Sequence, residues 1–203
     1  MAVVLTIDQR GSRTGPDRVP EWVNNLNREF SNALRMDFAR TVGDEMQALA
    51  SRPYVVADVV LRGVRLEEWW VGVGIGEVEI PLGESPGMSR GAAFYCARDA
   101  VGSAKESPYG FAVRSTDGDR AQAITAVLDL LCFVARRRGA NDSRRWEAVD
   151  LARGGLSPKQ IGAELGISRQ AASQRLQTAG WDEEQQGRWL SEWLLSPAIY
   201  SGG

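Results

Sequence analysis

Apolar and polar positions follow two different periods along the chain, and together they predict both strands and helices. Residues 3–7 form a short run rich in β-branched side chains, which predicts a central strand. Over residues 21–36, the apolar side chains Trp22, Leu26 and Phe30 share one helical face, which predicts an amphipathic helix. By the same criteria we expect further strands at 37–42, 46–50, 69–80 and 109–115, and further helices at 53–68, 90–106 and 119–138.

The order of these elements predicts the fold of the first part of the chain. Strand, helix, strand, strand, helix, strand is the split βαβ, or ferredoxin-like, arrangement, and an extra helix and strand follow it here. Gly139 and the polar residues after it break the long helix and mark a domain boundary. We therefore expect an α+β protein with a sheet domain at 1–139, an all-α helical domain at 140–195 and a flexible tail at 196–203.

Two features of strand 69–80 concern its packing. Gly72, Gly74 and Gly76 alternate along the strand, which favours close packing of a helix or of a partner chain over the sheet. Trp69 and Trp70 are adjacent, so they must point to opposite faces of a regular strand. The outward-facing tryptophan is covered either by a helix or by another subunit, and we favour a helix.

Two later helices carry more apolar surface than an ordinary amphipathic helix. Helix 119–138 is apolar over more than one face, which predicts burial against the sheet or against a second subunit. A last helix at 181–195 has Trp189, Trp193 and Leu194 as its apolar anchors.

Residues 156–180 carry the pattern around which the helical domain is organised. Ser157 is a candidate N-cap for a helix that begins with proline, where the missing N–H would have no partner in any case. Gly166 ends this helix, and Ser168 is the candidate N-cap of a second helix at 169–178. Two short helices joined by a tight turn with a Gly form the helix-turn-helix pattern.

The outer face of the second helix carries side chains that bond to bases and phosphates, and none of them is acidic. A face selected only for solubility would mix both signs of charge. The pattern therefore favours DNA binding over a helical hairpin that only packs. The base-edge candidates are Arg169, Gln170 and Gln174, and the phosphate candidates are Ser168, Ser173, Arg175, Lys159 and Arg145.

Composition excludes several classes of function. The chain has 203 residues, of which 43% are hydrophobic and 25% charged, as in an ordinary globular protein. It has no His and only two cysteines, Cys96 and Cys132, so a zinc site of Cys and His or a His-dependent triad is excluded. We find no apolar run that could span a bilayer and no signal peptide, and we expect a cytoplasmic protein without a disulfide.

Charge is distributed unevenly, although the net charge is only −2. Between residues 136 and 177, nine basic and four acidic residues give a net charge of +5, so the rest of the chain carries −7. A basic segment on a DNA-reading motif, with an acidic remainder that faces away from the phosphates, is the electrostatic pattern of a DNA-binding protein.

Two acidic residues stand at matching ends of predicted strands. Asp8 ends the first strand and Asp44 lies at the tip of the next hairpin, positions that a split βαβ sheet places side by side. Two carboxylates at such a point can hold Mg²⁺ against a triphosphate. The residues that could accompany them at a phosphate are Gly11 and Ser12, through backbone N–H groups, and Arg13 and Arg40, through their charge.

Two stretches resemble known families. The segment LSPKQIGAELGISRQAASQRL is similar to the helix-turn-helix of bacterial transcription regulators. The segments AVVLTIDQRGSR, RTVGDEMQALA, VGVGIGEV and SRGAAFYCARDAVGSAK resemble the SatD-like family, itself similar to a diverged class III nucleotide cyclase palm. The second resemblance implies that Asp8 and Asp44 match the cyclase metal-binding aspartates. It also implies that Arg40 takes the place of a base-reading Lys and that Arg98 matches the Arg of the N-x-x-x-R motif.

The departures from the cyclase pattern bear on activity. Phe94 stands where the motif has its Asn, and Arg10 replaces an apolar residue of the DIVGFT signature. Cyclase catalysis depends on electrostatic stabilisation of the transition state, so the loss of a donor favours a binding domain or a bare scaffold over an active cyclase.

The expected function is a DNA-binding transcription regulator that acts as a homodimer on double-stranded DNA, with the domain at 1–139 as its dimerisation domain and candidate ligand sensor. The residues do not identify a cofactor with certainty. The resemblance to nucleotide cyclases is compatible with a nucleotide and Mg²⁺ as the ligand. The alternatives are a metal-dependent nucleotidyl cyclase with an attached DNA module, and an adaptor whose helices only pack.

Overall fold

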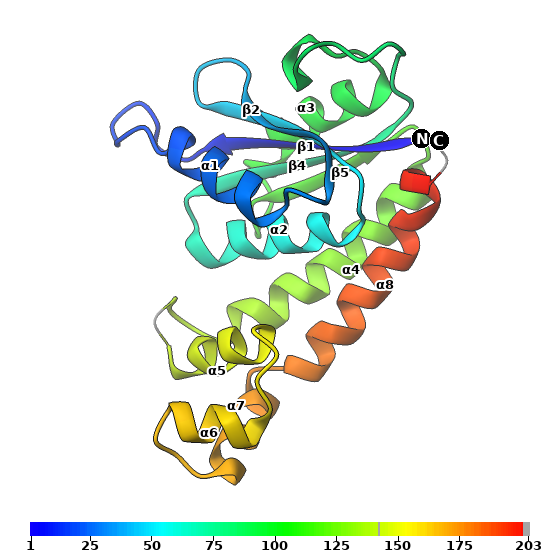
Figure 1. Cartoon of the computed structure of the whole chain (residues 1–203). Coiled ribbons are helices and arrows are strands. Elements are labelled where there is room, and N and C mark those ends of the chain that lie inside the picture. Colours follow the sequence, from blue (N-terminus) through cyan, green and yellow to red (C-terminus); the bar gives the residue numbers. More distant parts are fainter. Residues whose placement is uncertain (142, 201–203) are drawn as a thin grey trace.

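Two long helices join a sheet domain to a small helical module (Figure 1). The structure is a computed structural model that describes residues 1–141 and 143–200, with side chains up to residue 197. The strands are β1 (Ala2–Gln9), β2 (Leu34–Arg40), β3 (Glu45–Ala50), β4 (Trp69–Gly76) and β5 (Phe111–Ser115). The helices are α1 (Val19–Glu29), α2 (Tyr54–Leu66), α3 (Ala92–Ala104), α4 (Gly118–Arg136), α5 (Arg144–Arg153), α6 (Pro158–Glu164), α7 (Arg169–Thr178) and α8 (Trp181–Tyr200), with a 3₁₀ turn, η1 (Pro86–Met88).

The sheet has the strand order β2-β3-β1-β4-β5. The first four strands pair antiparallel in the split βαβ order, and β5 adds parallel to β4 through the crossover helix α3. Asp8 at the end of β1 pairs with Glu45 of β3 on one side and with Trp70 of β4 on the other. The α+β fold and the extra helix and strand are therefore as the sequence predicts.

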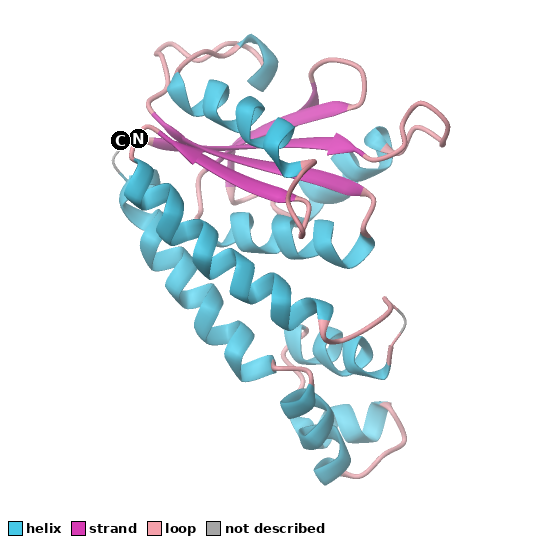
Figure 2. Ribbon diagram, turned by 180° about the vertical axis from the view of Figure 1, so that it is seen from behind, coloured by secondary structure: helices cyan, strands magenta, loops and turns pink. Residues whose placement is uncertain are grey.

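Helices cover both faces of this sheet (Figures 1 and 2). α1 and α2 lie on one face, where the larger apolar core forms, and α3 lies on the other. Trp69 points into the larger core and stacks on Trp22 of α1 with 4.2 Å between the ring centroids. Trp70, the tryptophan that faces away from this core, lies on the opposite face beneath the Arg10 guanidinium. A covering helix over Trp70 stays a prediction.

The glycines of β4 allow α3 to approach the sheet at backbone distance. A Cβ on Gly74 would lie 2.2 Å from both the Ala93 carbonyl oxygen and the Ala97 nitrogen. A Cβ on Gly72 would lie 2.3 Å from the Ala97 carbonyl oxygen. These contacts confirm close helix packing as the role of the alternating glycines.

α4 and α8 run side by side from the sheet domain to the helical module (Figure 1). Gly187 of α8 packs on Leu131 of α4, and α8 continues along α4 to contact α2 and β1. We expect a flexible tail from residue 196 onwards. Over 196–200 this prediction is wrong, because these residues belong to α8. Residues 201–203 lie outside the described residues. Trp189 and Trp193 are 67% and 61% exposed, so they are not the buried anchors that their spacing suggests.

Two other element boundaries differ from the sequence prediction by four or more residues, and the remaining ones by at most three. α1 ends at Glu29 rather than at residue 36, because Ala33 turns the chain through hydrogen bonds from Ser51 and Arg52 into the β2–β3 hairpin. Phe30 is buried at this turn, so its apolar character does not indicate helix. β4 ends at Gly76 rather than at residue 80, because the next segment turns towards the start of α3.

No helix among the described residues combines the length and apolar character needed to cross a bilayer.

Candidate nucleic-acid interface

The helical module is built from three short helices with well-defined ends. Ser157 and Gln160 form a reciprocal capping box at the start of α6, with the Ser157 N–H donating to Gln160 Oε1 at 2.9 Å. Gly166 takes a φ of +65° and reverses the chain between α6 and α7, a conformation that favours glycine. Ser168 Oγ then accepts a hydrogen bond from the Ala171 N–H at 3.1 Å and starts α7. The predicted caps and the predicted bounds of α7 are confirmed.

α6 and α7 pack through small residues, which brings their backbones close together. A Cβ on Gly162 would lie 2.8 Å from the Ile167 carbonyl oxygen. Ile161, Ala172 and Leu176 form the buried face of the pair. One side of α7 therefore packs against α6, α5 and α8, and the opposite side is exposed to solvent.

The exposed side of α7 presents the side chains that the sequence assigns to bases and phosphates. Arg169, Gln170, Ser173 and Gln174 are all exposed, and α7 contains no acidic residue. Lys159 is exposed near the start of α6. This arrangement provides long donor and acceptor side chains on a helix narrow enough for the DNA major groove.

Three of the five predicted phosphate contacts are engaged within the protein. Arg175 is half-buried and its guanidinium lies 4.0 Å from the Glu147 carboxylate of α5. Arg145 is exposed but donates a hydrogen bond to the Arg137 carbonyl at 3.3 Å. Ser168 uses its hydroxyl oxygen as the N-cap of α7. Lys159 and Ser173 are the phosphate candidates that are exposed and have no such role among the described residues.

A buried ion network lies where the helical module joins α4 and α8, and the sequence pattern does not predict it. The Arg138 guanidinium lies 2.5 Å from the Glu184 carboxylate, and neither side chain is exposed. Arg153 and Arg188 each approach the same carboxylate at 2.7 Å. Arg138 also donates to the Ala179 carbonyl at 2.9 Å, at the end of α7.

The sequence gives little sign of this network. Arg138 ends a run of three arginines that is typical of a solvated basic surface, and it contributes to the positive net charge of residues 136–177. Its burial arises only where α4, α7 and α8 meet in space. The four-residue spacing of Glu184 and Arg188 predicts a helical ion pair, but not its burial.

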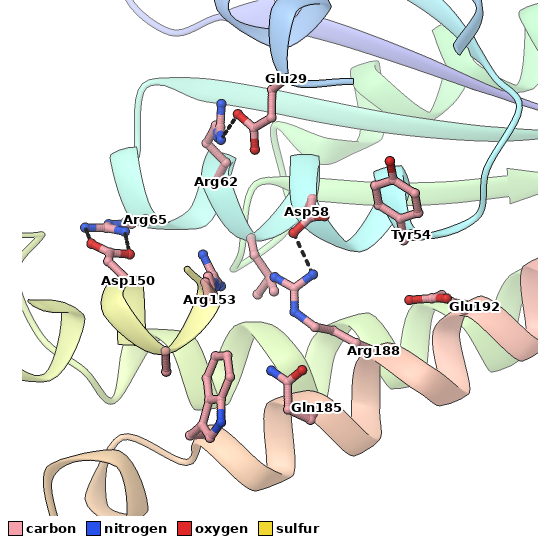
Figure 3. Close-up of a pocket in the computed structure, with 13 residues that line it drawn as sticks. Glu29, Tyr54, Asp58, Arg62, Arg65, Asp150, Arg153, Gln185, Arg188 and Glu192 are labelled. Atoms are coloured by element: carbon pink, nitrogen blue, oxygen red, sulfur yellow. Dashed lines mark hydrogen bonds and ion pairs between the residues drawn. The ribbon is translucent and has the colours of Figure 1, made fainter. Parts of the chain in front are cut away.

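Ion pairs also connect the module to α2 of the sheet domain (Figure 3). Arg188 of α8 donates to Asp58 of α2 at 2.6 Å, and Arg65 of α2 binds Asp150 of α5 at 2.6 Å. The Arg65 guanidinium also lies 4.2 Å from the ring centroid of Trp146. Asp58, Arg65, Asp150 and Arg188 border a pocket of about 610 Å³ between α2, α5 and α8, in which Arg65 faces Asp150 and Arg188 faces Asp58.

The predicted acidic pair comes together at the end of β1. The Asp8 and Asp44 carboxyl groups are in hydrogen-bonding contact, and the Ser12 hydroxyl donates to Asp44. Lys105 of the α3 C-terminus places its Nζ 2.5 Å from Asp8 Oδ2. Burial raises the pKa of Asp8, with Asp44 adding to the rise and Lys105 opposing it. The pKa of Asp44 is lowered, because the hydrogen bonds from Ser12 and Asp8 outweigh its burial.

A divalent metal fits this pair poorly. The Lys105 ammonium already neutralises Asp8, and Mg²⁺ would have to displace it. The described residues hold no cluster of three or more acidic or Cys side chains arranged for a metal.

The arginines that we expect near Asp8 and Asp44 lie at different positions from one another. Arg40 binds Asp17 at 2.5 Å and Arg13 is exposed, and both line a pocket of about 280 Å³ with Ser12 and Asp44. Gly11 takes a φ of +68° in the loop after β1. Arg98 lies 3.9 Å from Glu45 rather than at the aspartate pair.

The two departures from the cyclase pattern are parts of the packing. Phe94 is 1% exposed and belongs to the smaller apolar core beneath α3, so this position carries no donor towards a ligand. Arg10 folds back onto Trp70, with its guanidinium carbon 3.6 Å from the ring centroid, and donates to the Trp69 carbonyl.

Comparison with known proteins agrees with the geometry of the helical module. A family model described as a homeodomain-like domain matches residues 140–180, which span α5, α6 and α7. The chain has no significant match among curated proteins or among solved structures. The module is therefore of a DNA-binding type, whereas the resemblance of residues 2–107 to the SatD-like family remains a prediction.

Proposed function

We propose that the protein is a sequence-specific transcription regulator that binds double-stranded DNA through α7. The observation that carries this proposal is the exposed, acid-free face of α7, with Arg169, Gln170 and Gln174, on a module with homeodomain-like similarity. Arg bonds to guanine and Gln bonds to adenine in the major groove, so these residues can distinguish base pairs.

The protein acts as a dimer in this proposal. A recognition helix of ten residues contacts few base pairs, and helix-turn-helix proteins commonly bind as two copies on two half-sites about one helical turn apart. The sheet domain and the α4–α8 pair then set the separation of the two recognition helices.

The sheet domain has a proposed sensing role at the Asp8–Asp44 end. The pocket beside Asp44 includes Ser12, Arg13 and Arg40, which are groups that bind phosphate oxygens. Equilibrium dialysis with ATP and GTP tests this role, and the Asp44→Asn variant should change retention if the nucleotide contacts this end. Formation of a cyclic product with Mn²⁺ that is abolished by Asp44→Ala would instead support the cyclase alternative.

Selection from a pool of random duplexes tests the proposed function. The wild-type protein should enrich an inverted repeat with half-sites about 10 base pairs apart, and the Arg169→Ala Gln174→Ala variant should enrich no repeat. Failure of the wild-type protein to enrich any sequence, while it remains folded, would overturn the proposal.

A further inference from the structure

The outer side of the α4–α8 pair is an exposed apolar surface. On α4, Leu130 and Phe133 are 67% and 50% exposed, and on α8, Trp189, Leu190 and Trp193 are 67%, 38% and 61% exposed. We call these five residues the α4–α8 patch. Monomeric proteins seldom gather so many large apolar side chains on neighbouring exposed positions.

The contacts of the two helices place this patch on the side turned away from the sheet domain. Leu128 and Cys132 of α4 are buried, and Arg188 of α8 points to Asp58 of α2. Helical spacing puts Leu130 and Leu190 on the other side of each helix, next to the line where Leu131 meets Gly187. Figures 1 and 2 show the two helices side by side, and no described element lies over this outer side.

We propose that the α4–α8 patch is the surface through which two copies of this chain dimerise, and this inference rests on the proposed DNA-binding function. A second copy would complete a four-helix bundle from two α4–α8 pairs. The patch and the recognition helix are connected directly, because α4 leads into the module and α8 leaves it. A two-fold axis along the pair therefore places both modules at the same end of the dimer, as two half-sites require.

The size of the patch suits a dimer interface. Aromatic side chains bury roughly 150–250 Å² each, so the exposed parts of the three aromatic and two leucine side chains amount to on the order of 500 Å². A stable interface needs about 800 Å² per partner, and neighbouring exposed residues of α4 and α8 supply the remainder. Tryptophan is also enriched among the residues that contribute most to interfaces.

The charged residues at the module end of the α4–α8 pair are complementary to the same residues of a second copy. Arg137 at the end of α4 is exposed, and Asp182 and Glu183 at the start of α8 are exposed at the same level. In a two-fold pair, the Arg137 of each copy faces the Asp182 and Glu183 of the other copy. The outer side of the α4–α8 pair thus supplies both members of each charge pair, which a self-complementary surface requires.

Sedimentation velocity of the full chain at micromolar concentration tests the proposal. The wild-type protein should sediment as a dimer, and Trp193→Glu and Leu130→Glu should each raise the dimer dissociation constant by about 100-fold or more. Ile80→Glu is the control, because Ile80 is 68% exposed on the sheet domain, outside the patch. Circular dichroism checks that each variant remains folded, and the exposure of both patch residues makes unfolding unexpected.

The outcomes separate this inference from the proposed function. A monomeric wild-type protein, or a Trp193→Glu variant that stays dimeric, overturns the dimer surface even if DNA binding is intact. The folded, monomeric Trp193→Glu protein should still bind random duplexes at low salt through α7, but should lose its preference for the inverted repeat. Absence of all DNA binding by a dimeric wild-type protein would contradict the proposed function and leave the dimer surface standing.

Discussion

Arg138 Nη1 lies 2.5 Å from Glu184 Oε2, and neither side chain is exposed to solvent. Arg138 follows α4 and Glu184 lies in the first turn of α8, so the pair joins the points where the chain enters and leaves the helical module. Because Arg138 also binds the Ala179 carbonyl after α7, the position of α7 relative to the sheet domain depends on this pair.

Glu184→Gln should strongly destabilise the protein. The substitution leaves the buried guanidinium of Arg138 without a full counter-charge, and breaking a buried ion pair in this way costs about 3–5 kcal/mol. The free energy of unfolding in urea measures the effect. Glu164→Gln is the control, since Glu164 is an exposed acidic residue of α6 outside the network, and its change should stay within about 0.5 kcal/mol. Equal stability of the two variants would contradict a supporting role for the network.

The same network should make stability depend on acidic pH. Burial alone would raise the pKa of Glu184, but Arg153, Arg138 and Arg188 outweigh burial and lower it from 4.5 to about 2. Since the folded-state pKa is depressed, the stabilisation is fully present above the unfolded-state pKa and is lost as the pH falls through the folded-state value. The shift corresponds to roughly 3 kcal/mol. We therefore expect the stability difference between wild type and Glu184→Gln to shrink between about pH 4.5 and pH 2, as measured by chemical denaturation. A difference that stays constant over this range would count against the assignment.

Gly74→Ala should disrupt the contact between β4 and α3. The new Cβ would lie 2.2 Å from two backbone atoms of α3, and neither the strand nor the helix can yield without moving the other. A loss of more than about 3 kcal/mol, or failure to fold, is expected in thermal or chemical unfolding. Gly102→Ala in the same helix is the control, because its Cβ meets no atom within 4 Å and helix propensity should increase stability by up to about 1 kcal/mol. A Gly74→Ala protein as stable as wild type would show that α3 does not pack at this distance.

The contrast between α7 and Arg138 shows what could be predicted from the sequence. The bounds of α7 and its Ser168 cap follow from local chemistry, namely a cap, a turn glycine and a short apolar face, and the structure confirms them. The meeting of Asp8 and Asp44 follows from the strand order alone. The burial of Arg138 and the exposure of Trp193 depend on which helices meet, and helical spacing does not contain that information. For the same reason, the half-buried position of Arg175 against Glu147 could not be derived from its place on α7.

Lys159 and Arg175 should differ in their effect on DNA affinity. Lys159→Ala should weaken binding to all sequences and reduce the salt dependence by about one unit, because the proposed complex uses this exposed lysine at the start of α6 as a phosphate contact. Arg175→Ala should alter the salt dependence less, because this arginine faces Glu147. Affinities of a random duplex measured over a series of salt concentrations provide the comparison. The reverse order of the two effects would reassign the phosphate contacts.

The most direct test of DNA reading by α7 is an anisotropy titration of the selected duplex with wild type, Gln174→Ala and Gln185→Ala. Gln185 is an exposed glutamine of α8 that lines the pocket between α2, α5 and α8, away from the α4–α8 patch, and serves as the control. Loss of a bidentate base contact corresponds to about 1–3 kcal/mol, so Gln174→Ala should raise Kd by roughly 5- to 150-fold on the selected site and leave random DNA unaffected. The Gln185→Ala protein should match wild type. An unchanged Kd for Gln174→Ala and for Arg169→Ala, or a wild-type protein that binds no duplex at low ionic strength, would contradict the account.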